Sequence, residues 1–574
     1  MMAHVSDEEM NEHLRERAAL VLALDIGTSS LRASLYDDEA REIPGTQART
    51  ASNLSTTVEG GAELHADEAL EQVARTIDAT LSLAGPAAAH RINAVALSCF
   101  WHSLVGVDTK GRAITPVLGW ADTRAVLEAE ELRQRFDESL VHARTGAPFH
   151  PSYWPAKLLW LRRTQPETFK SVDCWMSLSD FLSLRLFGQS QSSVSMASGT
   201  GLFDLHRCAW DEELCGGLGV TPSRLPLIAE TDGAFNLLSS EYRGRWPQLK
   251  GARWYPAIGD GAANNIGAGC TSRNRMALMI GTSGAMRLLY EGAPPDGLPQ
   301  GLWCYRADRR RVVVGGALSD GGGLWAWMNE ALRLEQGAEE IERALAMLEP
   351  DAHGLTVLPF WAGERSTGWH PRARGAILGL SMHTRALEIL RASMEAVAYR
   401  LALIAEALYE FAPGAGLVAS GGALHASYVW PQIVSDVLGR PLILTGAEES
   451  SSRGAVLLAL EASDKIKSIG EERAPVERVI EPDMIRHARY GKAQKRQQKL
   501  YELLVAGEEA AHLINQSSRT ESEMSAAETT PTKLSTNINR SEETPEDERV
   551  NTEGNQQDSG AGPALHQHDS DAGH

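Results

Sequence analysis

The apolar residues of this 574-residue chain follow two periodicities. Short apolar runs that end in glycine, such as Leu22–Ile26, have the length and composition of buried strands. Longer stretches, such as Ala386–Leu408 and Tyr428–Leu438, carry apolar residues at three-to-four spacing, which is typical of helices with one packed face. Strands that alternate with helices in this way predict an α/β fold.

The sequence around the first strand occurs twice. Residues 23–37 read ALDIGTSSLRASLYD, and residues 277–291 read ALMIGTSGAMRLLYE. Both copies predict a strand, a tight Ile-Gly-Thr-Ser turn and a second short strand. A hairpin repeated at a domain-length interval indicates a duplicated fold. We therefore predict two α/β domains, at roughly 20–270 and 271–465.

Segments outside these domains differ in composition. Residues 1–19 are expected to form an N-terminal extension and residues 466–516 a helical C-terminal extension. Residues 517–574 are rich in Ser, Thr, Glu, Asn and Gln, and have few sizeable apolar side chains. Such a segment buries too little surface to offset its ordering entropy, so we predict a disordered acidic tail.

Composition narrows the class of protein. The chain is 43% hydrophobic and 23% charged, which is typical of a soluble globular protein. Its net charge of −20 argues against a nucleic-acid or anionic-membrane partner. No apolar run approaches the roughly 18 residues of a membrane span, and the six cysteines lack metal spacing. We expect a cytoplasmic protein, and the sequence leaves open whether it forms a homodimer.

The repeated turn has the residue types of a phosphate-binding loop. Glycine permits a tight turn, and the backbone N–H and hydroxyl groups that follow can point into one concavity. The predicted phosphate ligands are Gly27, Thr28, Ser29, Gly281, Thr282 and Ser283. The alternative is a pair of plain hairpins with polar tips. Asp25 in the first copy is matched by Met279 in the second, so one acid is available for a single Mg²⁺ held mostly through water.

Several further motifs, in this order, resemble those of the FGGY carbohydrate kinases. This family shares the fold of actin, hexokinase and the Hsp70 ATPase, and the likeness covers roughly residues 20–465. Asp25-Ile-Gly-Thr-Ser-Ser is similar to the family's first phosphate loop, Gly281-Thr-Ser-Gly to its second, and Ser420-Gly-Gly-Ala to its adenosine loop. The resemblance implies two duplicated ribonuclease H-like domains around a central cleft, with ATP and Mg²⁺ as cofactors.

Other motifs are similar to one branch of the family. Lys157-Leu-Leu-Trp and the segment 375–395 are similar to family signatures, while 98–108, 120–124 and 153–157 most resemble the gluconate-kinase-like branch. The resemblance implies phosphorylation of gluconate to 6-phosphogluconate. Xylulose, another pentulose or a polyol is the alternative substrate. A non-catalytic ATP-binding protein of the actin or Hsp70 kind is the alternative class.

Asp260 is the expected catalytic base. It lies in Ile258-Gly-Asp-Gly, after a predicted strand and before a helix, and matches the family's base by resemblance. Phosphoryl transfer requires a group that receives the hydroxyl proton of the acceptor. Gly259 and Gly261 are expected to let the substrate approach closely. The alternative is an aspartate that caps a helix starting at Ala262.

The expected sugar ligands follow two apolar runs. Trp101 and His102 come after the strand 94–99, where an aromatic ring can pack on a sugar and an imidazole can bind hydroxyls. Trp101 departs from the Met-His pattern of many family members, which leaves the substrate open. Asp122 and Arg124 are candidate hydroxyl or carboxylate ligands, or alternatively a surface ion pair.

The predicted nucleotide ligands are glycines in the second domain. Gly315 and the pair Gly421-Gly422 are expected to leave room for ribose and adenine, with ordinary turn glycines as the alternative. Lys157 and Arg365 are candidates to balance a substrate carboxylate, or are solvated surface cations. The chain has no GxxxxGK[ST] motif, so a P-loop does not bind the nucleotide.

Overall fold

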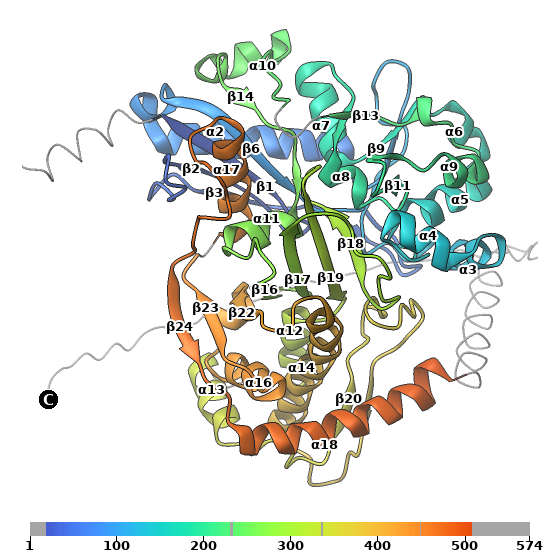
Figure 1. Ribbon diagram of the computed structural model, residues 1–574, viewed down its shortest axis with the longest axis vertical. Coiled ribbons are helices and arrows are strands. Elements are labelled where there is room, and N and C mark those ends of the chain that lie inside the picture. The colour runs from blue at the N-terminus through green and yellow to red at the C-terminus, as the bar shows by residue number, and fades with distance from the viewer. Residues whose placement is uncertain (1–18, 230–232, 335–336, 448, 508–574) are drawn as a thin grey trace, which may run out of the picture. The chain divides into compact units, whose positions relative to one another are not determined.

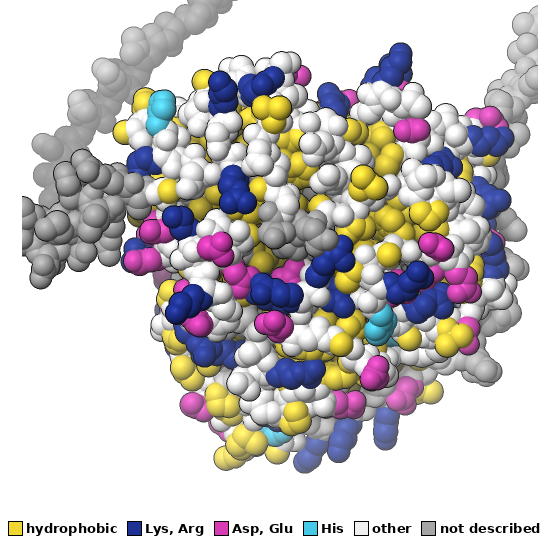
Figure 2. Space-filling model, turned by 45° about the horizontal axis from the view of Figure 1, so that its top comes forward, with side chains coloured by type: hydrophobic (Ala, Val, Ile, Leu, Met, Phe, Trp, Pro, Cys, Tyr) yellow, Lys and Arg dark blue, Asp and Glu magenta, His cyan; other side chains and the backbone are white. Residues whose placement is uncertain are grey.

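The computed structural model describes residues 19–229, 233–334, 337–447 and 449–507, and two large sheets organise them (Figure 1). The predicted N-terminal extension, apart from residue 19, and the predicted disordered tail lie outside the described residues. Within the described ranges, no helix is both long enough and apolar enough to cross a membrane. On the face drawn in Figure 2, basic and acidic side chains are interspersed.

The first sheet has the strand order β14-β6-β1-β2-β3, with β15 also beside β6. β1 runs antiparallel to β2 and parallel to β6, and β15 runs parallel to β6. The bounds are β1 (Leu20–Ile26), β2 (Ser30–Tyr36), β3 (Ala48–Ala51), β6 (Ile92–Cys99), β14 (Arg253–Trp254) and β15 (Ile258–Gly259).

The second sheet has the order β18-β19-β17-β16-β22-β23-β24. β16 runs antiparallel to β17 and parallel to β22, as β1 does to β2 and β6. The two predicted hairpins and the duplication are therefore confirmed. The bounds are β16 (Arg275–Ile280), β17 (Gly284–Glu291), β18 (Trp303–Arg306), β19 (Arg311–Leu318), β22 (Gly416–Ser420), β23 (Leu442–Thr445) and β24 (Val476–Ile480).

Helices cover both sheets, and the shorter strands form small separate sheets. The predicted long helices are confirmed as α14 (Ala386–Phe411) and α16 (Val429–Leu438). The other helices are α2 (Ala66–Ala89), α3 (Val126–Arg135), α4 (Glu138–Thr145), α5 (Trp154–Thr164), α6 (Pro166–Ser171), α7 (Leu178–Phe187), α8 (Val194–Ser198), α9 (Glu212–Leu218), α10 (Ser240–Arg245), α11 (Asp260–Gly267), α12 (Gly322–Ala331), α13 (Ala338–Ala346), α15 (Gly422–His425), α17 (Ser450–Ala462) and α18 (Met484–Tyr501). The short strands are β4 (Ser55–Thr56), β5 (Ala62–Leu64), β7 (Val105–Val107), β8 (Val117–Leu118), β9 (Cys174–Met176), β10 (Gln191–Ser193), β11 (Phe203–Asp204), β12 (Ala209–Trp210), β13 (Leu227–Ala229), β20 (Thr356–Leu358) and β21 (Ala376–Leu378).

The C-terminal extension is not purely helical, contrary to the prediction for residues 466–516. It first adds β24 to the second sheet, antiparallel to β23, and then forms α18. The residues of β24 are mostly exposed, which is why the apolar pattern did not reveal this edge strand.

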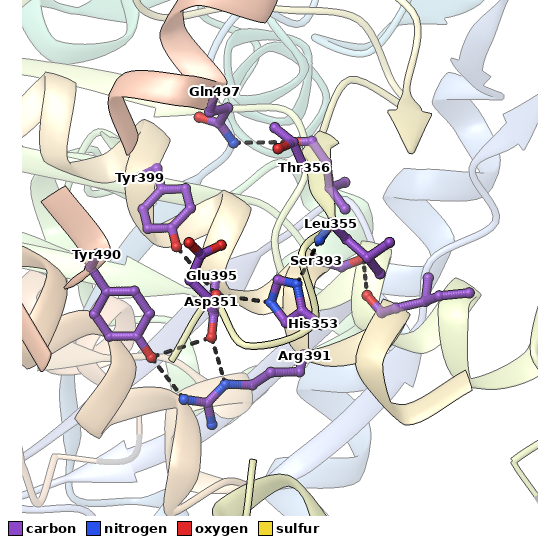
Figure 3. Close-up of polar contacts among 12 residues, drawn as sticks. Asp351, His353, Leu355, Thr356, Arg391, Ser393, Glu395, Tyr399, Tyr490 and Gln497 are labelled. Atoms are coloured by element: carbon purple, nitrogen blue, oxygen red, sulfur yellow. Dashed lines mark hydrogen bonds and ion pairs between the residues drawn. The ribbon is translucent and has the colours of Figure 1, made fainter. Parts of the chain in front are cut away.

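A buried polar network holds α18 against α14 (Figure 3). Glu395 of α14 accepts hydrogen bonds from Arg391 (2.8 Å), His353 (3.1 Å), Tyr399 (3.2 Å) and Tyr490 of α18 (3.3 Å). Burial works to raise the pKa of Glu395, but the His353 hydrogen bond and the Arg391 charge hold it below its ordinary value. The carboxylate is therefore ionised and fully partnered, and it fixes the extension to the second domain.

Helices α11 and α17 cross at two glycines. A Cβ atom at Gly454 of α17 would lie 1.9 Å from the carbonyl oxygen of Ala263, and one at Gly267 of α11 would lie 1.8 Å from that of Ser450. Only glycine permits this approach of two backbones. The apolar residues of α17 also share a core with β1 and β6. Although α17 belongs to the predicted second domain along the chain, it packs on the first sheet.

We predict opposite outcomes for two Gly→Ala substitutions. Gly454→Ala should lower the urea midpoint of unfolding, because the added methyl group overlaps a backbone oxygen and forces the helices apart at a cost of about 1–3 kcal/mol or more. Gly491→Ala in α18 is the control, since a Cβ atom placed there would meet nothing within 4 Å and alanine favours a helix by about 0.5–1 kcal/mol. Equal midpoints for the two variants would contradict this account of the crossing.

Candidate active site

Three neighbouring parallel strands bring the predicted catalytic and sugar-binding residues to one sheet edge. Asp25 lies opposite Ser98 near the end of β1, and Ile258 lies opposite the same Ser98 at the end of β15. Trp101 and His102 follow β6, and Asp260 follows β15. The carboxyl ends of parallel strands are where α/β folds bind ligands. The structure thus gathers Asp25, the Trp101-His102 pair and Asp260 as the sequence predicted.

Asp25 is buried and sits beside an arginine. Arg32 Nη1 lies 3.5 Å from Asp25 Oδ2 and 2.7 Å from Glu449 Oε2. Burial raises the pKa of Asp25 to about 6, the Arg32 charge and the Ser98 hydroxyl oppose this, and Asp260 adds to it. The side chain therefore has a structural partner in Arg32, and its role as a metal ligand stays a prediction.

Asp260 is the first residue of α11, not its N-cap. Gly259 occupies the cap position and α11 starts at Asp260, two residues before the expected Ala262. Asp260 Oδ1 accepts a hydrogen bond from the Gly261 N–H (2.8 Å). Burial raises the pKa of Asp260, while the charge of Arg287 on β17 works to lower it. The N-terminus of a helix and a neighbouring guanidinium both favour the ionised form of this carboxylate, against the effect of burial.

The glycines around Asp260 make room for the protein's own tryptophan. A Cβ atom at Gly259 would lie 1.9 Å from the Trp101 ring, and one at Gly261 would lie 2.5 Å from it. The Trp101 indole donates to Ser195 O (2.9 Å) and is 5% exposed. Our expectation that these glycines admit the substrate directly is therefore corrected, because the indole fills that space. Trp101 packs beside Asp260 rather than presenting an open face.

His102 contacts Arg365 from the second domain. His102 Nδ1 faces the carbonyl of Gly199, so this nitrogen carries the proton and Nε2 is an acceptor, 3.5 Å from Arg365 Nη2. Burial and the Arg365 charge hold the pKa of His102 well below its usual range. A neutral imidazole at this edge can accept a hydrogen bond.

Lys157 is not a solvated surface cation, and that alternative is wrong. Its side chain is 1% exposed, and Nζ donates to His102 O and Gly119 O, both at 2.8 Å. Burial lowers the pKa of Lys157 to about 7. The amine thus fastens the loop after β6 to the loop after β8.

Asp122 and Arg124 pair with each other. Arg124 Nη2 lies 2.6 Å from Asp122 Oδ2 and 2.8 Å from Glu63 Oε2. Asp122 is 2% exposed, so the ion pair is buried on its acidic side and not a surface pair. Trp120, from the same loop, lies under the guanidinium of Arg365 at 5.2 Å. Substrate contact by Asp122 or Arg124 stays a prediction.

The second hairpin meets two other glycine-rich turns. The N–H groups of Gly322 and Gly323, at the start of α12, donate to Gly281 O (2.7 Å) and Thr282 O (2.9 Å). Gly421, before α15, has a φ of 105° and packs against the Ile280 carbonyl, so only glycine fits there. This gathering of turns at the start of a helix suits an anionic phosphate chain.

Gly315 lies inside β19 and not in a turn. A Cβ atom there would lie 2.6 Å from Met286 O and 3.0 Å from the Trp303 ring, and one at Gly316 would lie 2.8 Å from Ile404. Packing within the protein thus explains both glycines. Nucleotide contact at Gly315 stays a prediction without support from these neighbours.

The donor set at Asp25 suits a hard cation that keeps most of its waters. Among the described residues, no group of three or more His, Cys, Asp or Glu side chains could hold a metal ion. One buried carboxylate, with hydroxyl residues in the adjoining turn, is the pattern of a Mg²⁺ that is bound through one acid and substrate phosphates.

Sequence reasoning missed two groups in this site. Arg287 is 7% exposed beside Asp260, but within a strand it has no distinguishing pattern. Asp320, just before the glycines of α12, accepts a hydrogen bond from the Ala362 N–H (3.2 Å). The run Gly321-Gly322-Gly323 between a strand and a helix was a usable signal for this turn.

Comparison with known proteins identifies relatives of this chain. The model of the FGGY family of carbohydrate kinases, N-terminal domain, matches residues 20–267, and that of the C-terminal domain matches residues 276–463. A gluconokinase of Bacillus subtilis (strain 168) is 28% identical over 463 residues, which cover 78% of this chain and 88% of the relative. A xylulose kinase of Escherichia coli (strain K12) is 26% identical, covering 85% of this chain and 99% of the relative.

A solved structure with the same fold is that of gluconate kinase from Lactobacillus acidophilus. It superposes with a TM-score of 0.78 at 25% sequence identity, covering 85% of this chain and 99% of that chain. The predicted fold class of duplicated actin- and hexokinase-like domains is therefore confirmed.

Asp320 predicts a pH dependence of stability. Burial raises its pKa from 3.8 to about 7, while backbone N–H groups of Ala362 and Trp361 oppose the shift. The folded chain therefore binds this proton more tightly than the unfolded chain. The stability that this bound proton contributes is fully present below about pH 4 and is lost as the pH rises through 7.

Asp320→Asn removes this titration. At pH 8 we expect the free energy of unfolding of the variant to exceed that of the wild type by up to about 4 kcal/mol. This difference should shrink towards pH 4. Thermal unfolding across this range measures it. A difference that does not change with pH would show that Asp320 titrates normally.

Proposed function

Because the chain belongs to the FGGY family of carbohydrate kinases, we propose that it uses ATP to phosphorylate gluconate, giving 6-phosphogluconate. The observation that carries this proposal is the placement of Asp260 at the start of α11, on the sheet edge that also bears Asp25, Trp101 and His102. The gluconokinase and gluconate kinase relatives support the choice of substrate.

Asp260 accepts the proton of the attacking hydroxyl in this proposal. Its carboxylate accepts a hydrogen bond from the Gly261 N–H, and the charge of Arg287 favours its ionised form, so it is oriented before the substrate arrives. Trp101 restricts the space beside it, because the indole packs against Gly259 and Gly261. His102 Nε2 is an acceptor that a substrate hydroxyl can engage in place of its long 3.5 Å contact with Arg365 Nη2.

The two hairpins bind the nucleotide in this proposal. Gly27, Thr28 and Ser29 face its terminal phosphates from the first domain, and Gly281, Thr282 and Ser283 do so from the second. Gly421 and Gly422 lie towards the adenosine. Asp25 holds Mg²⁺, which supplies charge stabilisation at the phosphates when bound.

A pentulose is the alternative acceptor, which the xylulose kinase relative favours. A coupled assay of ADP release over gluconate, xylulose, ribulose, glycerol and other polyols separates the two. The proposal expects the highest kcat/KM with gluconate. A preference for xylulose would show that the acceptor is a pentulose, and the proposed phosphoryl transfer from ATP would still stand.

Asp260→Asn tests the base. Turnover should fall by about a hundredfold or more, because the amide cannot accept the proton, while ATP still binds. Stopped assays of product formation and calorimetric titration with ATP measure the two effects.

Asp137→Asn is the matched control for this substitution. Asp137 caps α4 by accepting from the Ser139 and Leu140 N–H groups, a role that Asn fills equally well. Near-wild-type turnover of the Asp260→Asn variant would contradict the assignment of Asp260 as the base.

Asp25→Asn tests the metal ligand. The chain should fold, since Met279 occupies the same place in the second hairpin, but transfer should slow about a hundredfold or more and require more Mg²⁺. Turnover against Mg²⁺ concentration, with circular dichroism for folding, measures this. Unchanged rate and Mg²⁺ dependence would leave Asp25 as the structural partner of Arg32.

A further inference from the structure

Arg287 is a buried guanidinium that lacks partners. Its side chain projects from β17 and is 7% exposed, yet Nε and Nη1 have no hydrogen-bond partner among the described residues. A Cβ atom at Gly261 would lie 2.7 Å from Nε, so the group lies directly beside the Asp260 turn. Buried N–H groups without partners cost free energy, and a folded protein retains them where a ligand completes them.

Arg365 offers a second guanidinium to the same place. It is half-buried, and its Nε also lacks a partner among the described residues. Nη2 lies 3.5 Å from His102 Nε2, and the guanidinium sits over the Trp120 ring at 5.2 Å. Arg287 and the Trp101 ring both lie against Gly261, and Arg365 contacts His102, the residue after Trp101, so both guanidinium groups lie beside the Trp101-His102 pair.

The two guanidinium groups carry like charges, and an anion bound between them offsets their repulsion. Asp260 balances only part of this charge, since no hydrogen bond joins its carboxylate to Arg287 among the described contacts. Lys157, the other candidate cation, already donates to the carbonyls of His102 and Gly119. The unsatisfied positive charge of the site therefore lies on the two arginines.

We propose that Arg287 and Arg365 form the binding site for the carboxylate of the sugar acid, an inference that rests on the proposed function. Guanidinium groups bind carboxylates through two parallel N–H···O bonds, a geometry that lysine cannot offer. The carboxylate then accepts hydrogen bonds from free N–H groups of both arginines. Neutral sugars leave these N–H groups unpaired. The free-energy cost of the unpaired groups therefore favours binding of sugar acids over neutral sugars.

Arg365 is positioned by its neighbour Glu364. Glu364 is 2% exposed and accepts hydrogen bonds from Tyr501 of α18 (2.8 Å), from the Gly368 N–H (3.2 Å) and from Arg400 of α14. The loop that carries Arg365 is thus clamped to α14 and to the C-terminal extension.

The rival explanation is that Arg287 only keeps Asp260 ionised. That role would affect every substrate equally, because it acts on the base. Carboxylate binding affects only the acid. The comparison of gluconate with its neutral isostere D-gluconamide therefore separates the two roles.

The experiment measures kcat and KM for gluconate and D-gluconamide with wild type, Arg287→Met and Arg365→Met. We expect each variant to raise KM for gluconate about tenfold or more and to reduce the preference for gluconate over the amide by a similar factor. Circular dichroism checks that Arg287→Met is folded, because the substitution removes the positive charge beside the buried Asp260. Arg374→Met is the control, because it removes an exposed charge from the same loop.

Each outcome decides between the two proposals. A wild type that phosphorylates gluconate, with variants that keep its preference for gluconate over the amide, overturns the carboxylate site and leaves the proposed function standing. An equal loss of kcat on both substrates shows instead that Arg287 acts only through its effect on Asp260. A wild type without gluconate activity overturns both proposals.

Discussion

The close crossing of α11 and α17 is the constraint on which the site depends. Gly267 and Gly454 let two helix backbones touch, and no other residue fits at either place. α11 starts at Asp260, while α17 packs on β1 and β6 and begins beside Glu449, which binds Arg32. One contact between helices from the two halves of the chain therefore sets the place of Asp260 and steadies the hairpin of β1 and β2.

Charge organises the site around that contact. Asp25 and Asp260 lie at the carboxyl edge of the first sheet, while Arg287 and Arg365 come from the second half of the chain. Acids from one half and cations from the other meet at the site that we propose for an anionic acceptor and the nucleotide. Lys157 does not contribute to this charge balance, because its amine donates to two backbone carbonyls.

The sequence predicted what local pattern and duplication encode. The two hairpins, the long helices and the position of Asp260 between strand and helix followed from residue order alone. Long-range packing did not. The return of α17 to the first sheet, the indole of Trp101 over Gly261 and the unpartnered guanidinium of Arg287 depend on which surfaces meet, which no local periodicity records. The exposed β24 was missed because an edge strand need not alternate.

The central claim is that Asp260 accepts the proton of the hydroxyl that is phosphorylated, while the two arginines beside it bind the carboxylate of the same sugar acid. Phosphorus–proton correlation NMR of the product made from gluconate and ATP tests it most directly, because it identifies the phosphorylated carbon. The account predicts phosphate on the primary C6 hydroxyl, remote from the carboxylate. Phosphate on a hydroxyl next to the carboxylate, or no phosphorylated gluconate at all, would contradict it.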